Sequence, residues 1–258
     1  MAITYKRFVD SIDDAAGVLE VEAACWNEAT RSPQSLLELF RSTEQVQACW
    51  LAQAAGQVVG FMHAFATFDG GLTTWELDLL AVHPDWRRRG IATELVRRAT
   101  RDAPSSAARA RTMIATDNIP SAKAFQRVGY DTDAGLSRIY VLDTPGGDAP
   151  SPEWPPEVTI AQQPGKPSWV AAAAGHGRVS LLAVRTVLYD GLWVEGFARD
   201  TSPALLAAAL AHAAQQGLDL VGLIVPASDP AAISVVQAAG CESLGDYLTW
   251  THPLPLPD

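Results

Sequence analysis

Apolar residues follow two different periods along the first 143 residues. Short runs rich in β-branched and aromatic residues alternate with segments in which apolar residues recur every three or four positions. The first pattern is typical of strands and the second of amphipathic helices. We expect strands over 3–9, 48–54, 58–68, 73–82 and 110–116, helices over 13–29, 33–42, 90–102 and 120–128, and one or two final strands through 141. This order predicts an α+β domain, with a mixed central sheet flanked by helices.

A segment rich in proline and glycine, residues 144–157, interrupts these patterns. Such a composition is typical of a linker and disfavours regular structure. The sequence therefore predicts one domain over 1–143 and a second over 158–258.

The second half repeats the first in a shorter form. Residues 50–56, Trp-Leu-Ala-Gln-Ala-Ala-Gly, are similar to residues 169–175, Trp-Val-Ala-Ala-Ala-Ala-Gly. Each is followed by two apolar runs, a helical pattern, a buried run and a helix that ends in glycine. We interpret this as an internal duplication without the first two helices, a truncated α/β domain. The alternative is that any two strand–helix alternations look alike.

A basic loop joins the apolar run 75–82 to the helical pattern after Gly90. It contains Arg87, Arg88 and Arg89. The free N–H groups and the dipole of a helix N-terminus favour an anion, and phosphate is the natural ligand. The alternative is a solvated basic turn at the start of a surface helix.

The spacing Arg87-x-x-Gly90-x-Ala92, preceded by Val-His-Pro at 82–84, resembles the pyrophosphate loop of the GNAT acetyltransferase superfamily. The resemblance implies the GNAT fold over residues 1–143, acetyl-CoA as acyl donor and no metal. It also implies that CoA contacts the end of the preceding strand and the start of the helix, at Leu80, Ala81, Val82, Arg87, Arg88, Arg89, Gly90, Ile91, Ala92 and Thr93.

A second motif begins at Asn118 and ends at Gly129, and it resembles the GNAT segment Asn-x-x-Ala…Tyr-x-x-x-Gly-Phe. The resemblance implies further CoA contacts from Asn118, Ser121 and Phe125. In the family a tyrosine often stands where this chain has Phe125, and it is a candidate general acid for the departing thiolate. Phenylalanine cannot donate a proton, so either another donor, such as Tyr130 or Tyr140, replaces it, or the thiolate leaves unaided.

The resemblance also suggests catalytic groups on the strand before the loop. The backbone N–H of Leu80 is expected to stabilise the oxyanion. Asp78 is the preferred general base and Glu76 the second candidate. The two-residue period of a strand places both carboxylates on one face. The alternative is that both are solvent-facing residues of an alternating strand.

Composition narrows the class of protein. The net charge of −10 argues against a nucleic-acid partner, and no apolar run is long enough to span a membrane. The N-terminus lacks the apolar stretch of a signal peptide. The three cysteines are widely spaced without a Cys-x-x-Cys motif, and the five histidines are scattered, so neither a disulfide framework nor a metal site is indicated. We expect a cytoplasmic protein.

The resemblance therefore implies an N-acetyltransferase that transfers an acetyl group from acetyl-CoA to a primary amine, by direct attack in a ternary complex. The acceptor is a small molecule or a peptide, and residues 11–45 and 130–143 are expected to line its site. The second copy has no glycine or arginine cluster at the corresponding loop, where Asp200 would repel phosphate. We therefore expect it to be non-catalytic and to pack against the first half, shape the cleft or form a homodimer. The alternative function is an acyl-CoA-binding sensor or scaffold.

Overall fold

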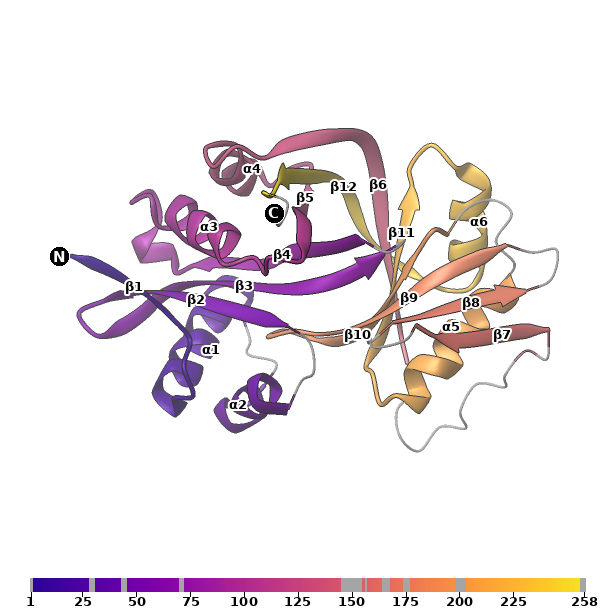
Figure 1. Ribbon diagram of the computed structural model, residues 1–258, viewed down its shortest axis with the longest axis horizontal. Coiled ribbons are helices and arrows are strands. Elements are labelled where there is room, and N and C mark those ends of the chain that lie inside the picture. Colours follow the sequence, from indigo (N-terminus) through magenta and orange to yellow (C-terminus); the bar gives the residue numbers. More distant parts are fainter. Residues whose placement is uncertain are drawn as a thin grey trace. The chain divides into compact units, whose positions relative to one another are not determined.

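The computed structural model describes residues 2–27, 31–42, 46–69, 72–144, 155, 157–163, 168–173, 177–197 and 203–255. The chain forms two compact units, whose elements are labelled in Figure 1. Unit 1 comprises Met1–Asp133, Thr186–Leu188 and Trp250–Asp258, and unit 2 comprises Ala134–Arg185 and Tyr189–Thr249. Among the described residues, no helix is long and apolar enough to cross a membrane.

Unit 1 has the order of elements that the hydrophobic pattern predicts. The elements are β1 (Ile3–Arg7), α1 (Ile12–Trp26), α2 (Pro33–Ser42), β2 (Gln47–Ala54), β3 (Gln57–Asp69), β4 (Leu72–Val82), the short 3₁₀ helix η1 (Pro84–Trp86), α3 (Ile91–Arg101), β5 (Ala107–Ala115) and α4 (Ile119–Gln126). The strands follow the order β1-β2-β3-β4-β5. Neighbours are antiparallel except β4 and β5, which are parallel, so the sheet is mixed as expected.

Helices cover both faces of this sheet (Figure 1). Helices α1 and α2 pack on one face, in a buried cluster that contains Val18 and Leu36 together with Phe61 and Ala81 of the strands. Helices α3 and α4 pack on the other face. Their buried cluster contains Leu95 of α3 together with apolar residues that the strands direct to that face. Alternate residues of each strand therefore belong to different cores.

Unit 2 repeats the strand pairing of unit 1. Its elements are β6 (Asp131–Asp143, of which residues 134–143 lie in unit 2), β7 (Val158–Gln162), β8 (Ser168–Ala173), β9 (Arg178–Arg185), β10 (Asp190–Glu195), α5 (Pro203–Gln215), β11 (Leu220–Pro226), α6 (Pro230–Ala238) and β12 (Glu242–Pro253). Strands β7 to β10 are successively antiparallel, and β10 is parallel to β11. This is the topology of β1 to β5 without α1 and α2.

The two copies also share a helix cap. The Asn118 side chain accepts a hydrogen bond from the Ser121 N–H at 3.3 Å at the start of α4, and Asp229 accepts one from the Ala232 N–H at 3.1 Å at the start of α6. Each cap is followed by proline in the first turn. Topology and cap together confirm the internal duplication.

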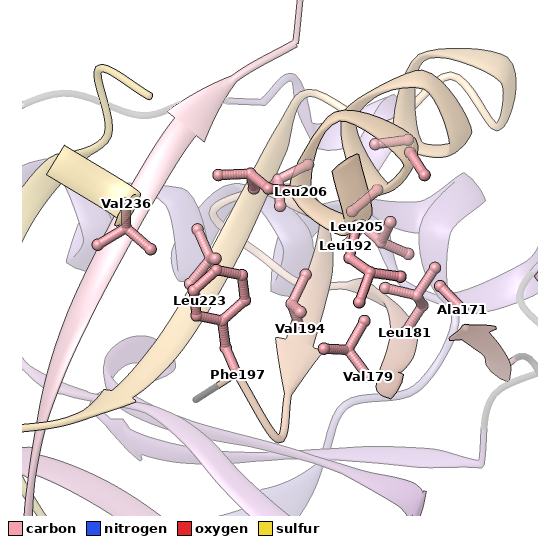
Figure 2. Packing of buried hydrophobic residues seen from close by; sticks show 14 of the residues in the cluster. Ala171, Val179, Leu181, Leu192, Val194, Phe197, Leu205, Leu206, Leu223 and Val236 are labelled. Carbon is pink, nitrogen blue, oxygen red and sulfur yellow. The ribbon is translucent and has the colours of Figure 1, made fainter. Parts of the chain in front are cut away.

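The core of unit 2 lies between α5, α6 and one face of its strands. Figure 2 shows Leu205 and Leu206 of α5 against side chains of the strands, with Val236 of α6 nearby. These side chains are almost entirely buried, so unit 2 has an apolar core of its own.

The last strand of each copy does not stay with its own copy. Residues 137–143 of β6 pair with β11 in unit 2, and the end of β12 belongs to unit 1, where the Leu254 N–H donates to the Ala108 carbonyl at 3.3 Å. The units therefore divide at Asp133/Ala134, whereas the sequence predicts a boundary after residue 143. Most of the expected linker 144–157 lies outside the described residues.

This exchange predicts that the first half is unstable when expressed alone. The His252 ring lies 5.2 Å from the buried Tyr130 ring, so residues 250–254 cover part of the unit 1 core. A chain that ends after Thr249 should unfold at a temperature at least several degrees lower, because losing about 1–2 kcal/mol shifts the Tm by that amount. Circular dichroism would measure the shift. A chain that ends after Pro255 keeps these contacts and serves as the control; equal melting of both truncated chains would contradict the prediction.

Candidate functional site

Strand β4 contains a bulge at Asp78. Leu79 pairs with His63 and Leu77 pairs with Ala64, so Asp78 is an extra residue without a position in the β3–β4 register. A bulge bends the strand and re-aims its side chains. The expected shared face of Glu76 and Asp78 rests on a two-residue period, and the bulge interrupts that period between Leu77 and Leu79.

Beyond Glu76, β4 also separates from β5. The parallel pairing ends at Glu76 with Arg111, although β5 continues to Ala115 and β4 to Val82. The His83 N–H donates to the Val59 carbonyl at 3.0 Å. Because bonded and non-bonded pairs alternate in an antiparallel ladder, the N–H and C=O groups of Leu80 and Val82 point away from β3, toward the side that β5 has left.

The loop after β4 presents backbone N–H groups at the start of α3. Arg88 and Gly90 have positive φ values of 62° and 78°. Gly90 is the N-cap and supplies no side-chain bond, so the first N–H groups of α3 are oriented outward with the positive end of the helix dipole. No other atom lies within 4 Å of the position that a Cβ on Gly90 would occupy. The loop is thus open where an anion would approach.

A cavity of about 490 Å³ lies over this loop. Eleven of the thirteen residues that the family resemblance assigns to CoA line it: Leu80, Ala81, Val82, Arg87, Arg88, Gly90, Ile91, Ala92, Thr93, Asn118 and Ser121. Four of the cations of unit 1, namely Arg87, Arg88, Lys123 and Arg127, are in its wall, and the described residues of the wall include no Asp or Glu. The cavity therefore suits an elongated, negatively charged ligand.

The three consecutive arginines have different partners. The Arg87 Nε donates to the Val82 carbonyl at 3.1 Å. Arg89 is turned away from the cavity, because its guanidinium lies 4.5 Å from the centre of the Trp86 ring and donates to the Asp85 carbonyl at 3.3 Å. Arg88 lines the cavity and is exposed. Arg87 and Arg88 are therefore the arginines available to a ligand, and Arg89 stabilises the loop.

Phe125 does not line the cavity. Its ring is buried and lies edge-on to Tyr130, with centroids 5.0 Å apart. Tyr130 is also buried, its hydroxyl is 2.8 Å from the Thr100 hydroxyl, and burial raises its pKa above the ordinary value. Tyr140 belongs to the core of unit 2. None of these rings is in the cavity wall.

Glu76 is held by an ion pair. Its carboxylate lies 2.7 Å from an Arg111 guanidinium nitrogen and accepts a hydrogen bond of 2.7 Å from the Thr67 hydroxyl. Both charged side chains are largely buried, 12% and 17% exposed. Glu76 thus joins β3, β4 and β5 just before the two parallel strands separate, which favours a structural role. Asp78, two residues further, is half-buried at the bulge and outside the cavity wall.

Sequence reasoning placed residues 11–45 at the acceptor site and did not assign α1 to the donor cavity. Cys25 and Trp26, at its C-terminal end, line the cavity, and the Cys25 thiol lies 3.5 Å from the Val82 carbonyl. Lys123 and Arg127 were missed as well, although they are four residues apart, at the end of α4 and at its C-cap. A search for basic residues on the polar face of that helix would have found them.

Comparisons with known proteins agree with this geometry. Residues 16–130 match the model of the acetyltransferase (GNAT) family. Residues 16–130 are therefore similar to a GNAT acetyltransferase domain. Enzymes of this family are acyltransferases that use acetyl-CoA as a substrate. No curated protein matches the sequence significantly.

Solved structures resemble the whole chain, both units of it. A tandem GNAT protein from the clavulanic acid biosynthesis pathway, determined without acetyl-CoA, matches with a TM-score of 0.58 at 17% identity over 100% of both chains. A GCN5-related N-acetyltransferase from Sphaerobacter thermophilus matches with a TM-score of 0.55 at 19% identity, over 99% of this chain and 97% of the other. A putative acetyltransferase from Pyrococcus horikoshii gives 0.59 at 14%, over 98% and 90%. These likenesses confirm the fold, a GNAT domain followed by a shorter GNAT-like domain.

The ion pair of Glu76 predicts a loss of stability rather than of chemistry when it is broken. Glu76→Gln leaves Arg111 largely buried without its carboxylate, so the free energy of unfolding should fall by about 1–3 kcal/mol. Urea titration would measure it. Glu94→Gln is the matched control, because Glu94 pairs with Arg97 and Arg98 at a more exposed site and should lose less than about 1 kcal/mol. Equal losses in both variants would contradict the structural role.

Proposed function

We propose that the chain transfers an acetyl group from acetyl-CoA to a primary amine, by direct attack of the amine in a ternary complex. One observation carries the proposal. A single cavity brings together the open N-terminus of α3 and the backbone groups of β4 that β5 has left unpaired. An acyl donor with a pyrophosphate and an amide-bearing arm matches both parts.

The donor end of the cavity fits the phosphates of CoA. The first N–H groups of α3 and the loop at Arg88 and Gly90 supply hydrogen-bond donors, and Arg87 and Arg88 supply charge. Lys123 and Arg127 extend the positive surface along α4. The backbone groups of Leu80 and the N–H of Val82 suit the amides of the pantetheine arm, which would pair with β4 as an added strand does.

The acyl end would lie at Leu80. Its N–H, which points toward the gap between β4 and β5, is oriented to stabilise the oxyanion that forms when the amine attacks the thioester carbon. One preorganised donor contributes on the order of 3 kcal/mol. Holding the amine against the thioester contributes up to roughly 7–11 kcal/mol in ideal geometry.

Asp78 is the group that we assign to the proton. It is two residues from Leu80, and the bulge removes its side chain from the regular alternation of β4. The amine nitrogen forms the new bond to the carbonyl carbon, the amine proton passes to the Asp78 carboxylate, and the carbon–sulfur bond breaks with its electron pair on sulfur. No tyrosine is among the described residues of the cavity wall, so we assign no tyrosine as the acid for the departing thiolate.

The experiment that tests this function is the release of free CoA thiol from acetyl-CoA in the presence of four amines: a polyamine, an aminoglycoside, an amino acid and a peptide with a free N-terminus. Amine-dependent thiol release supports an N-acetyltransferase. Binding of acetyl-CoA without release of thiol with any amine would favour the alternative, a sensor or scaffold. Absence of binding would overturn both.

The different partners of the arginines give a matched set of variants for the donor site. Arg87→Glu or Arg88→Glu should weaken acetyl-CoA binding about 10- to 100-fold, because each removes a cation from the cavity wall, where a charge-assisted hydrogen bond contributes about 1.5–3 kcal/mol. Isothermal titration calorimetry would measure the Kd. Arg89→Glu introduces the same change of charge within two residues of Arg87 and Arg88, and it should weaken acetyl-CoA binding the least. The site is misplaced if all three variants bind acetyl-CoA as the unmodified protein does.

A general base at Asp78 predicts a separation of rate from binding. Asp78→Asn should lower kcat about 10²- to 10⁴-fold, the usual contribution of general acid–base catalysis, with little change in the Kd of acetyl-CoA. The fall of kcat toward acidic pH should also disappear, because the group that must lose a proton is gone. Glu76→Gln, measured below its unfolding temperature, is the control. An unchanged pH profile in Asp78→Asn would assign the base elsewhere.

A further inference from the structure

Three residues of the second half are part of unit 1. Thr186–Leu188 form the turn between β9 and β10, and these strands lie in unit 2, but the turn itself belongs to the first unit. Thr186 and Val187 are fully buried there. A turn between two strands is ordinarily a surface feature, so complete burial of its backbone requires partners for its carbonyl groups.

Arg31 supplies those partners. Its Nε donates to the carbonyls of Thr186 and Val187, at 3.1 Å each. The turn is held in shape from within, because the Thr186 hydroxyl accepts a hydrogen bond of 3.2 Å from the Leu188 N–H. The guanidinium is therefore bound to a fixed pair of acceptors.

Arg31 stands directly before the first turn of α2. The next residue, Ser32, begins that turn: its hydroxyl accepts from the Ser35 N–H at 3.1 Å and its carbonyl from the Leu36 N–H at 3.0 Å. Fixing Arg31 therefore fixes where α2 starts and where the connection from α1 ends.

Val187 packs in the core beneath the same helices. Its cluster contains residues of α1 and α2 and includes Ala81 of β4, which is adjacent to Leu80 in the cavity wall. Cys25 of α1, which also lines the cavity, packs against this cluster. The turn thus contacts helices α1 and α2. These lie on the sheet face opposite α3, which is the helix that follows the phosphate loop.

We propose that Thr186–Leu188 is a specificity-determining element for the acceptor amine, contributed by the second half to the catalytic unit. It positions the start of α2, which lies in the segment 11–45 that we expect to line the acceptor site. The proposal rests on the proposed function, since it concerns the acceptor of that reaction. This role requires no donor site in the second copy, because the turn of the second copy supports the acceptor side of the first.

The test compares two variants that loosen the turn with one that does not. Arg31→Met removes the two hydrogen bonds, and Val187→Ala removes packing in the shared core. Both should raise the KM for an amine accepted from the panel of four by about 2- to 10-fold, the factor expected for one lost hydrogen bond, and alter the ranking of the amines. The Kd of acetyl-CoA, measured by calorimetry, should change less than about twofold, because neither Arg31 nor Val187 lines the cavity.

Val179→Ala is the matched control. It is the same substitution at a residue that is 2% exposed, but it lies in the core of unit 2. It should leave both the KM for the amine and the ranking unchanged. An unchanged amine KM in Arg31→Met and Val187→Ala would overturn the proposal. So would a parallel weakening of acetyl-CoA binding, which would show that the turn stabilises the whole unit without selecting the acceptor.

Hydrogen exchange provides a measurement that needs no acceptor. In Arg31→Met, exchange of the Leu36 amide should become faster, whereas exchange of the Glu94 amide in the first turn of α3 should not change. If the Leu36 amide keeps its rate, the turn does not position α2 and the proposal fails, even where the protein acetylates an amine. Failure of acetyl-CoA to bind the unmodified protein would instead refute the proposed function.

Discussion

The rest of the site depends on the separation of β4 from β5 after Glu76. Up to that residue the two strands are paired, and the ion pair between Glu76 and Arg111 joins them. Beyond it, the extra residue Asp78 changes the register of β4 against β3, and the backbone groups of Leu80 and Val82 lose the neighbour that a continuous sheet would give them. Unpaired groups at the centre of a sheet are unfavourable unless another partner binds them. On the side of β5, the backbone groups of β4 beyond Glu76 therefore have no neighbouring strand, and an amide-bearing ligand can pair with this part of β4 as an added strand does.

The exchange of last strands connects the stability of the two copies. Each unit takes one strand, or its end, from the other half of the sequence, so neither half of the sequence contains all of one unit. The turn at Thr186–Leu188 follows the same principle on a smaller scale. A duplicated domain that has lost its own phosphate loop can be retained for these structural contributions. Asp200 and its neighbours, in the loop that lost the motif, lie outside the described residues.

Much of this architecture is predictable from local patterns. The alternation of apolar residues, Gly90 before an amphipathic helix and Asn118 before proline are each determined by neighbours in the sequence, and the structure places them as expected. The bulge at Asp78 and the partner of Glu76 are not local, because they depend on the register of β3 and on Arg111 in another strand. The same holds for Arg89, which a pattern of three arginines cannot distinguish from Arg87. Burial of Phe125 depends on Tyr130 and on which face of α4 meets the sheet.

The two faces of the sheet pack in two different cores, each with its own helices. Leu80 and Val82 pack against the core shared with α3, while Ala81 and Leu79 pack against the core shared with α1 and α2. Consecutive residues of one strand are thus supported by different helices. A substitution in the core beneath α3 should alter the donor site. A substitution in the core beneath α2 should alter the opposite side of the sheet. Because β4 itself is common to both, we propose that the two substrates of a direct transfer meet at its bulge, with the Leu80 N–H on one side and the Asp78 carboxylate at the point where the alternation breaks.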